Sequence, residues 1–470
     1  MPKGVNLRGS MPGARVLPPT ERWVTQKVDQ LTYTDKRTWQ QRYFISEEHY
    51  TKGGPIFLML GGEREANPAW LQNGQWVRQA LQHKAMLIYL EHRYYGQSRP
   101  TSDISVSNLQ YLTVEQALED VANFQRYIST SLSLANDTTW IVFGGSYAGT
   151  LAAWFRLKYP DLVNAAVASS APVFPTKDFK DYYVTAALSL LLHGGADCYN
   201  TLINATMTIL NYTTTDSGRE QLQYIITLCE PMTTVNKQDI ANVFSTMASY
   251  VGEVVQFNNG ARQFEGIKGW NYGIKEFCTD MSSDDPYAGD PIYRYSRFLS
   301  ARLGNSGKTC LEHRYSRVRE NLKDTDWDSD VAKGERQWLY QSCTQFGFFQ
   351  TSESNNQPFG SNFPDSYFLQ MCKDVFNTED YDLDEGIYEL QQKYGGYSPN
   401  ISHAIFVTGQ NDPWVSLGIT KNLPNDVTAI NIYGAAHCAD MYPDYPMDTV
   451  ELVQARLEID AILAGWISRP

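Results

Sequence analysis

Three residues of the types that together catalyse acyl transfer occur in the order serine, aspartate, histidine along the chain. Ser146 follows a short apolar run, and Asp412 and His437 each lie in a loop after a later apolar run. A serine hydroxyl becomes a good nucleophile when a neutral imidazole accepts its proton, and a carboxylate orients that imidazole. These residues therefore predict a serine hydrolase in which Ser146 is the nucleophile, His437 the general base and Asp412 the orienting acid.

The segment around Ser146 has the composition of a sharp strand-to-helix turn. A β-branched and aromatic run at 141–143 precedes the serine, and apolar residues at helical spacing follow it as far as Pro160. Gly144 and Ala148 are small, which a serine on such a turn requires because the strand and the helix converge there. Ala148 departs by one methyl group from the usual G-x-S-x-G pattern. A glycine-rich turn that carries an ordinary serine is the alternative interpretation.

The position of His437 distinguishes it from the other histidines. Of the seven in the chain, three precede Ser146, two fall in a mostly helical segment and one begins a strand at the wrong end. In α/β-hydrolases the catalytic residues follow the order serine, acid, histidine, each on a loop at the carboxyl end of a strand. Only His437 satisfies this order, although a lone histidine is more often structural.

The elements that must position these residues follow a strand-helix rhythm with one long interruption. Short apolar runs predict buried strands at 55–60, 85–90, 139–145, 163–171, 403–409 and 427–433. Between them the pattern is mostly helical, which predicts a cap inserted into the sheet domain. We therefore expect an α/β fold, an α/β-hydrolase domain formed by 20–177 and 377–470 that carries a large helical, disulfide-stapled cap at 178–376.

Two loops at the predicted sheet edge contain further candidates. Gly61, Gly62 and Glu63 follow an early strand, and in an α/β-hydrolase such a loop supplies one N–H of the oxyanion hole while the residue after the nucleophile supplies the other. We therefore predict Gly62 and Tyr147 as these donors, with a glycine turn that binds nothing as the alternative. The segment 91–96 holds an acid, an imidazole and a guanidinium, of which Arg93 is expected to form a structural ion pair rather than to take part in catalysis.

The composition limits the partners and the location of the protein. A net charge of −13 over 470 residues argues against nucleic acid and anionic membranes as partners. No apolar run approaches the roughly 20 residues of a membrane span. The cysteines are too widely spaced for a zinc site, and we predict no metal and no cofactor.

Cysteines and glycosylation sequons both favour an oxidising compartment. Six of the seven cysteines lie between residues 198 and 372, which suggests disulfides. Four N-x-S/T triplets predict glycosylation at Asn136, Asn204, Asn211 and Asn400. Residues 1–19 contain no apolar signal region, so no signal peptide is visible in this sequence. We expect a secreted or a lysosomal or endosomal protein.

Several motifs together resemble one family of serine peptidases. The segments at 26–29, 91–96, 144–160 and 411–414 are similar to the family of lysosomal Pro-X carboxypeptidase, dipeptidyl peptidase II and thymus-specific serine protease. The segment 337–348 resembles the thymus-specific branch most closely, although the family more often has glutamate where Gln345 stands.

The resemblance implies a capped α/β-hydrolase with the triad Ser146, Asp412 and His437, which acts as a serine exopeptidase next to proline. It also implies the disulfides Cys198–Cys278, Cys229–Cys310 and Cys343–Cys372, with Cys438 free. By the same resemblance Phe348 and Thr150 are candidates for the substrate pocket, and Thr150 replaces a methionine of relatives. Trp414, two residues beyond Asp412, is expected to form one wall of that pocket, with core packing at the base of a loop as the alternative, and Glu63 is a further pocket candidate because of its charge.

The charge of the substrate pocket should decide whether the amino end or the carboxyl end of a peptide enters it. Glu63 or an acid in the cap would select the free amine of a peptide substrate, whereas Arg93 or an arginine in the cap would select the carboxylate. Dipeptide release from the amino end is slightly favoured over Pro-X carboxypeptidase activity. The same residues would also suit an esterase or lipase of this fold, and a non-catalytic binding protein of the hydrolase fold is the hypothesis from outside the enzymes. A homodimer is left open.

Overall fold

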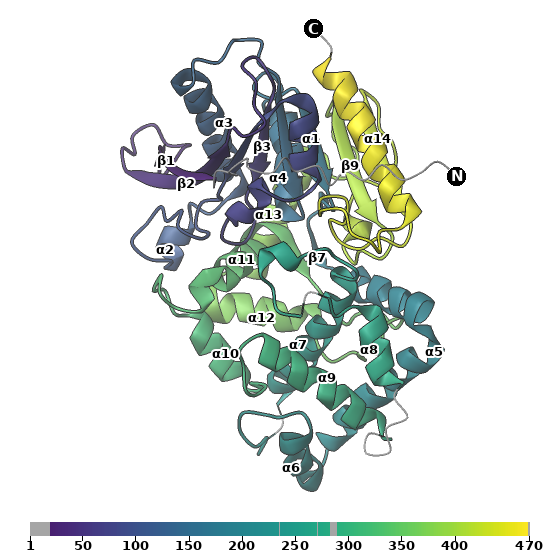
Figure 1. The fold of residues 1–470 in the computed structure, drawn as a ribbon. Helices are drawn as coiled ribbons and strands as arrows, with labels where there is room; N and C mark the ends of the chain where they lie inside the picture. The colour runs from purple at the N-terminus through teal and green to yellow at the C-terminus, as the bar shows by residue number, and fades with distance from the viewer. Residues whose placement is uncertain (1–18, 235, 270, 283–288, 469–470) are drawn as a thin grey trace, which may run out of the picture.

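An eight-stranded mixed sheet forms the centre of the larger domain (Figure 1). The computed structural model describes residues 19–234, 236–269, 271–282 and 289–468. The sheet has the order β1-β2-β4-β3-β5-β6-β9-β10, with β1–β2 and β2–β4 antiparallel and every other pair parallel. The strands are β1 (Thr20–Lys27), β2 (Thr38–Ser46), β3 (Ile56–Leu60), β4 (Met86–Leu90), β5 (Trp140–Gly145), β6 (Ala165–Ser169), β9 (Ala404–Gly409) and β10 (Val427–Ile432).

Helices cover both faces of this sheet, because its central strands are apolar on both sides. Phe57, Ile141 and Ile405 pack in one core with α1 (Gln75–His83) and α14 (Val450–Ile467). The alternate residues Leu58 and Val142 face a second core that includes apolar residues of α3 (Val114–Ser131) and α4 (Tyr147–Lys158). The arrangement confirms the predicted α/β-hydrolase fold.

A helical cap is inserted between β6 and β9 and lies at one end of the sheet domain (Figure 1). The short parallel strands β7 (Thr176–Asp178) and β8 (Gly347–Phe349) pair where the cap joins the domain. The cap helices are α5 (Asp181–Tyr212), α6 (Asp216–Ile225), α7 (Lys237–Gln256), α8 (Ile274–Met281), α9 (Pro291–Asn305), α10 (Tyr315–Leu322), α11 (Glu335–Gln341) and α12 (Asp365–Phe376). The remaining helices are α2 (Val106–Leu109), before α3, and α13 (Asp380–Tyr394), which precedes β9. The predicted boundaries at 178 and 376 stay a prediction.

Three disulfides hold the cap together, and they are the pairs that the resemblance implies. Cys198–Cys278 joins α5 to α8, Cys229–Cys310 joins the segments that follow α6 and α9, and Cys343–Cys372 joins the turn after α11 to α12. Closing loops of 80 and 81 residues in the unfolded chain stabilises a fold by about 4 kcal/mol each in the chain-entropy account. Cys438 is buried and free.

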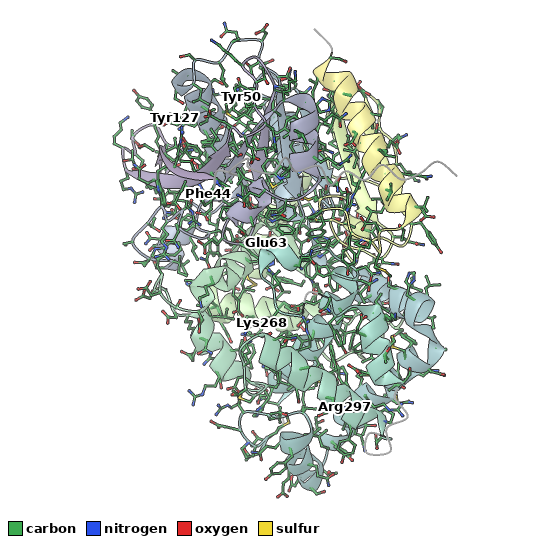
Figure 2. All side chains as sticks on the ribbon, viewed as in Figure 1. Phe44, Tyr50, Glu63, Tyr127, Lys268 and Arg297 are labelled. Carbon is green, nitrogen blue, oxygen red and sulfur yellow. A yellow bond between two sulfur atoms is a disulfide. The ribbon has the colours of Figure 1, made fainter. Side chains whose placement is uncertain are left out.

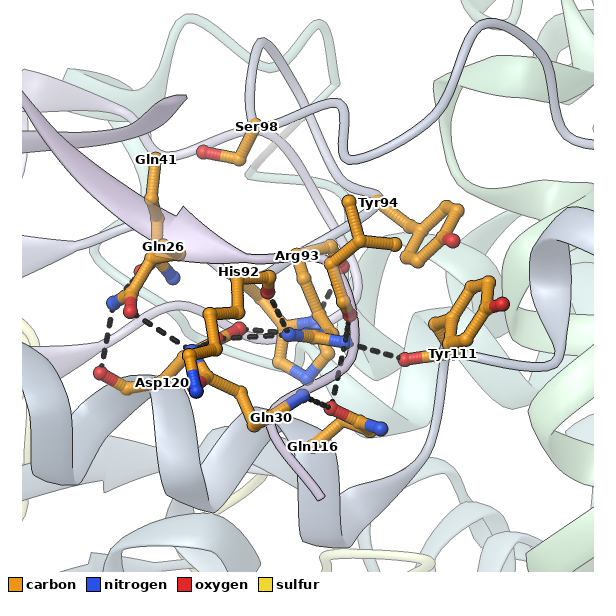
Figure 3. A network of polar contacts seen from close by, with 12 residues as sticks. Gln26, Gln30, Gln41, His92, Arg93, Tyr94, Ser98, Tyr111, Gln116 and Asp120 are labelled. Atoms are coloured by element: carbon orange, nitrogen blue, oxygen red, sulfur yellow. Dashed lines mark hydrogen bonds and ion pairs between the residues drawn. The ribbon is translucent and has the colours of Figure 1, made fainter. Parts of the chain in front are cut away.

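Arg93 forms the structural ion pair that the sequence predicts (Figure 3). Its Nε and Nη2 donate to the two carboxylate oxygens of Asp120 at 2.6 and 2.8 Å, and both side chains are fully buried. Nη1 donates to the backbone carbonyl oxygens of Tyr111 and Val28. The network ties the loop after β4 to α3 and to the end of β1, beneath the edge of the sheet where the candidate site lies.

We expect Arg93→Leu to lower the free energy of unfolding by at least about 3 kcal/mol, because Asp120 would keep its hydrogen bond from Gln30 but would be a buried carboxylate without a counter-charge. Chemical denaturation followed by tryptophan fluorescence measures the change. Lys333→Leu removes one member of an exposed ion pair and should leave the unfolding midpoint where it is. Equal effects of the two substitutions would contradict the structural role of Arg93.

Candidate active site

Ser146 occupies a strained turn between β5 and α4. Its φ of 58° and ψ of −133° lie in a region that non-glycine residues rarely adopt. A Cβ on Gly144 would come within 2.0 Å of the backbone oxygen of Ala148, and one on Gly149 within 2.9 Å of the oxygen of Ser169. The glycines that flank the serine are therefore required by the close approach of strand and helix, as a nucleophile elbow demands.

His437 and Asp412 form a buried hydrogen-bonded pair. The Nδ1 atom of His437 lies 2.9 and 3.0 Å from the two carboxylate oxygens of Asp412, and the backbone N–H of Trp414 also donates to this carboxylate, at 3.0 Å. Because an ionised carboxylate only accepts hydrogen bonds, the proton belongs on Nδ1, which leaves the lone pair of Nε2 free to accept one. His437 Nε2 is buried and has no hydrogen-bond partner among the described residues.

Ser146 and His437 line the same cavity, which has a volume of about 340 Å³. Within the described part of the chain, no hydrogen bond joins the serine hydroxyl to the unpartnered Nε2 of His437. Such bonds are often long in an empty site and shorten when substrate binds. The structure thus brings the predicted serine, histidine and aspartate to one site, with the histidine–aspartate bond already formed.

The surroundings of His437 act on its pKa in opposite directions. Burial lowers the pKa, whereas the charge of Asp412 and the contribution of the neighbouring Cys438 side chain raise it, so that the pKa lies well above its ordinary value. A raised pKa makes the imidazole a stronger base, and it also means that the base is lost to protonation at a higher pH than for a free histidine.

The predicted oxyanion-hole residues lie on two sides of the elbow. Tyr147 is the first residue of α4, where a backbone N–H has no acceptor within its own helix. Gly62 lines the cavity, and a Cβ there would lie 3.5 Å from Ala148. The Tyr147 side chain points elsewhere, since its hydroxyl is bonded to His92 and to Gln341. Burial lowers the pKa of His92 to about 4, so this histidine is neutral and structural.

Of the four residues predicted for the substrate pocket, only Glu63 lines the cavity, and Figure 2 shows it where the sheet domain meets the cap. The ring centroids of Trp414 and Phe348 lie 5.5 Å apart, and those of Trp414 and His437 lie 6.5 Å apart. Thr150 is buried, and its hydroxyl donates to the backbone oxygen of Pro172 at 3.0 Å. The Thr150 side chain is therefore hydrogen-bonded to the segment that follows β6.

Several other residues around the site were not predicted. Gln256, Arg262 and Glu265 reach the cavity from the cap, and Arg262 pairs with Glu265 at 2.6 Å. Beneath the elbow, burial raises the pKa of Asp440 to about 6, and its carboxylate accepts a hydrogen bond from the hydroxyl of Ser169. No motif in the sequence marks Gln256, Arg262 and Glu265, because their positions depend on how the cap lies on the sheet.

The sheet, the elbow and the buried histidine–aspartate pair define a serine hydrolase of the α/β-hydrolase fold. Comparison with known families gives a match to the family described as serine carboxypeptidase S28 over residues 26–459, and the chain belongs to that family. It is accordingly a serine peptidase.

Individual relatives agree with this family. The chain is 32% identical to the thymus-specific serine protease of Homo sapiens, with 97% of this chain and 88% of the relative covered. It is 29% identical to the lysosomal Pro-X carboxypeptidase of Mus musculus, with 94% and 88% covered. Among solved structures, the proline iminopeptidase of Mycobacterium smegmatis matches with a TM-score of 0.39 and 11% identity, over 95% of this chain and 97% of that chain.

We expect Asp412→Asn to lower peptidase turnover by about 10⁴-fold, because an amide cannot hold the Nδ1–H tautomer as a carboxylate does. The negative charge of Asp412 raises the pKa of His437, so its loss should move the acid limb of the residual kcat/KM profile to lower pH. A pH–rate profile of both proteins measures the two effects. The exposed Asp216 provides the control, since Asp216→Asn should leave the profile unchanged.

Proposed function

We propose that the protein is a serine exopeptidase that cleaves peptides next to proline or a small residue. The observation that carries the proposal is the buried hydrogen bond from His437 Nδ1 to Asp412, with the unpartnered Nε2 of the same ring at a cavity that Ser146 also lines. This arrangement suits a histidine that accepts a proton from the serine hydroxyl.

The proposed reaction has two acyl-transfer steps. Ser146 Oγ attacks the scissile carbonyl carbon while His437 Nε2 takes its proton, and the N–H groups of Tyr147 and Gly62 bind the oxyanion of the tetrahedral intermediate. The C–N bond then breaks, and the imidazolium protonates the departing amine. Water repeats the sequence on the acyl-enzyme and releases the second product.

Charge in the cavity favours binding of the amino end of a peptide. Glu65 pairs with Arg42 and Glu265 pairs with Arg262, whereas Glu63 forms no ion pair with a described residue and is left to bind an ammonium group. Arg93 cannot select a carboxylate because it is buried against Asp120. We therefore favour release of dipeptides from the amino end.

A second candidate function is that of a Pro-X carboxypeptidase. Arg64 lines the same cavity, and a guanidinium there would suit the carboxylate end of a peptide. For either activity, the preference for proline rests on the resemblance to relatives, because the Trp414 ring beside His437 and the Phe348 ring that packs on Trp414 do not line the cavity. The name of one relative, Pro-X carboxypeptidase, agrees with this preference.

We further infer a secreted or a lysosomal or endosomal location. Three disulfides favour an oxidising route of synthesis. The predicted glycosylation sites are all exposed in the structure, at Asn136, Asn204, Asn211 and Asn400. No described helix combines the length and the apolar character of a membrane span. Peptides are the proposed partners, and the homodimer stays a prediction.

Ser146→Ala should abolish both peptide hydrolysis and covalent labelling by a fluorophosphonate probe, because the attacking oxygen is gone. Gel fluorescence after labelling measures the effect, and circular dichroism checks that the fold is intact. Ser316, which is exposed on α10, provides the matched control, since Ser316→Ala should label like the wild-type protein. Undiminished labelling of Ser146→Ala would disprove the assignment of the nucleophile.

A peptide-library digest read by mass spectrometry tests the specificity. We expect cuts two residues from the amino end, enriched in proline or alanine before the cut, because the cap and the loop of Glu63 restrict the cavity to a chain end. Acetylation of the amino terminus should then suppress cleavage. Internal cuts in long peptides would refute an exopeptidase, and cleavage at the carboxyl end would favour the second candidate.

A further inference from the structure

Gln256 joins the cap to the candidate catalytic histidine. It is the last residue of α7, and its backbone oxygen accepts the N–H of His437 at 3.0 Å. Its side-chain Oε1 accepts the hydroxyl of Tyr182 at 2.8 Å and the indole N–H of Trp414 at 3.2 Å. One residue of the cap therefore contacts the loops of both His437 and Asp412 as well as α5.

These contacts determine which way the amide of Gln256 faces. The indole nitrogen of tryptophan can only donate, so the amide atom that faces Trp414 is the oxygen. The NH₂ group lies on the other branch of the amide, and it forms no hydrogen bond with any described residue. Because Gln256 lines the cavity together with Ser146 and His437, this branch is available as a donor to a bound molecule.

We propose that Gln256 is a substrate-binding residue whose Nε2–H donates a hydrogen bond to a backbone carbonyl oxygen of the peptide. The inference rests on the proposed function. The carbonyl concerned is one other than the scissile carbonyl, whose oxygen faces Tyr147 and Gly62. Other polar groups from the cap are less available, because Arg262 is already paired with Glu265. A primary amide suits this task because it is neutral and is held by two donors on its oxygen.

Gln256→Glu tests the role, because glutamate keeps an acceptor for Trp414 and Tyr182 and removes the donor. We expect kcat/KM for a proline-containing peptide to fall at least about tenfold, the usual effect of losing a hydrogen bond to a buried polar group. p-Nitrophenyl acetate has no peptide carbonyl, so on the pH plateau of each protein its kcat/KM and the fluorophosphonate labelling rate should fall much less than kcat/KM for the peptide. Full pH profiles are needed, because the new carboxylate lies near His437 and raises its pKa.

Two controls make the result specific. Gln263→Glu adds the same charge at an exposed position of the same cap segment and should leave both substrates unaffected. Gln256→Met adds no charge but removes the donor together with the acceptor for Trp414 and Tyr182, and its loss should again be larger on the peptide than on the ester.

Parallel losses on peptide, ester and probe would overturn the proposal, because they would mean that Gln256 only positions His437. Unchanged peptide hydrolysis in Gln256→Glu would overturn it as well. Failure of the wild-type protein to label at Ser146 is a separate result that would refute the proposed function itself.

Discussion

The close approach of β5 and α4 at Ser146 is the constraint on which the rest of the site depends. Backbone atoms of Ala148 and Ser169 stand where side chains on Gly144 and Gly149 would have to lie. The strained, positive-φ conformation of Ser146 is supported by the hydrogen bond that its own N–H donates to the backbone oxygen of Ser169 at 2.9 Å. The end of β6 therefore stabilises this backbone conformation, and the serine is held at the cavity instead of within the core.

The end of β6 also connects the elbow with a loop far away in the sequence. The hydroxyl of Ser170 accepts the N–H of Cys438, and the hydroxyl of Ser169 donates to the buried carboxylate of Asp440. Two adjacent residues at the end of β6 thus contact the serine turn on one side and the histidine loop on the other. The distance between the candidate nucleophile and base depends on these short polar contacts, which is why a cap of about two hundred residues can be inserted between them without separating them.

The sequence predicted those features that depend on residues close together in the chain. The strands came from apolar runs and the elbow from its small residues. The ion pair of Arg93 followed from its place at a strand end. The cavity wall could not be predicted in this way, because helical periodicity does not say which cap residue reaches the sheet. Thr150 is directed to Pro172 for a tertiary reason, and Gln256 carries no motif. The assignment of the triad itself stays a prediction.

The hydrogen bond from His437 to the end of α7 makes the orientation of the candidate base depend on the cap as well as on the sheet domain. The chain from β1 to β6 can pair before the cap residues have been synthesised, but β9 and β10 follow the cap in the chain. The imidazole of His437 is therefore oriented only after β9 and β10 have joined the sheet and the folded cap holds α7 in place. The cap contains all three disulfides. Formation of the cap disulfides is accordingly coupled to the orientation of the candidate base, so the strands of the sheet alone would not hold His437 as the complete fold does.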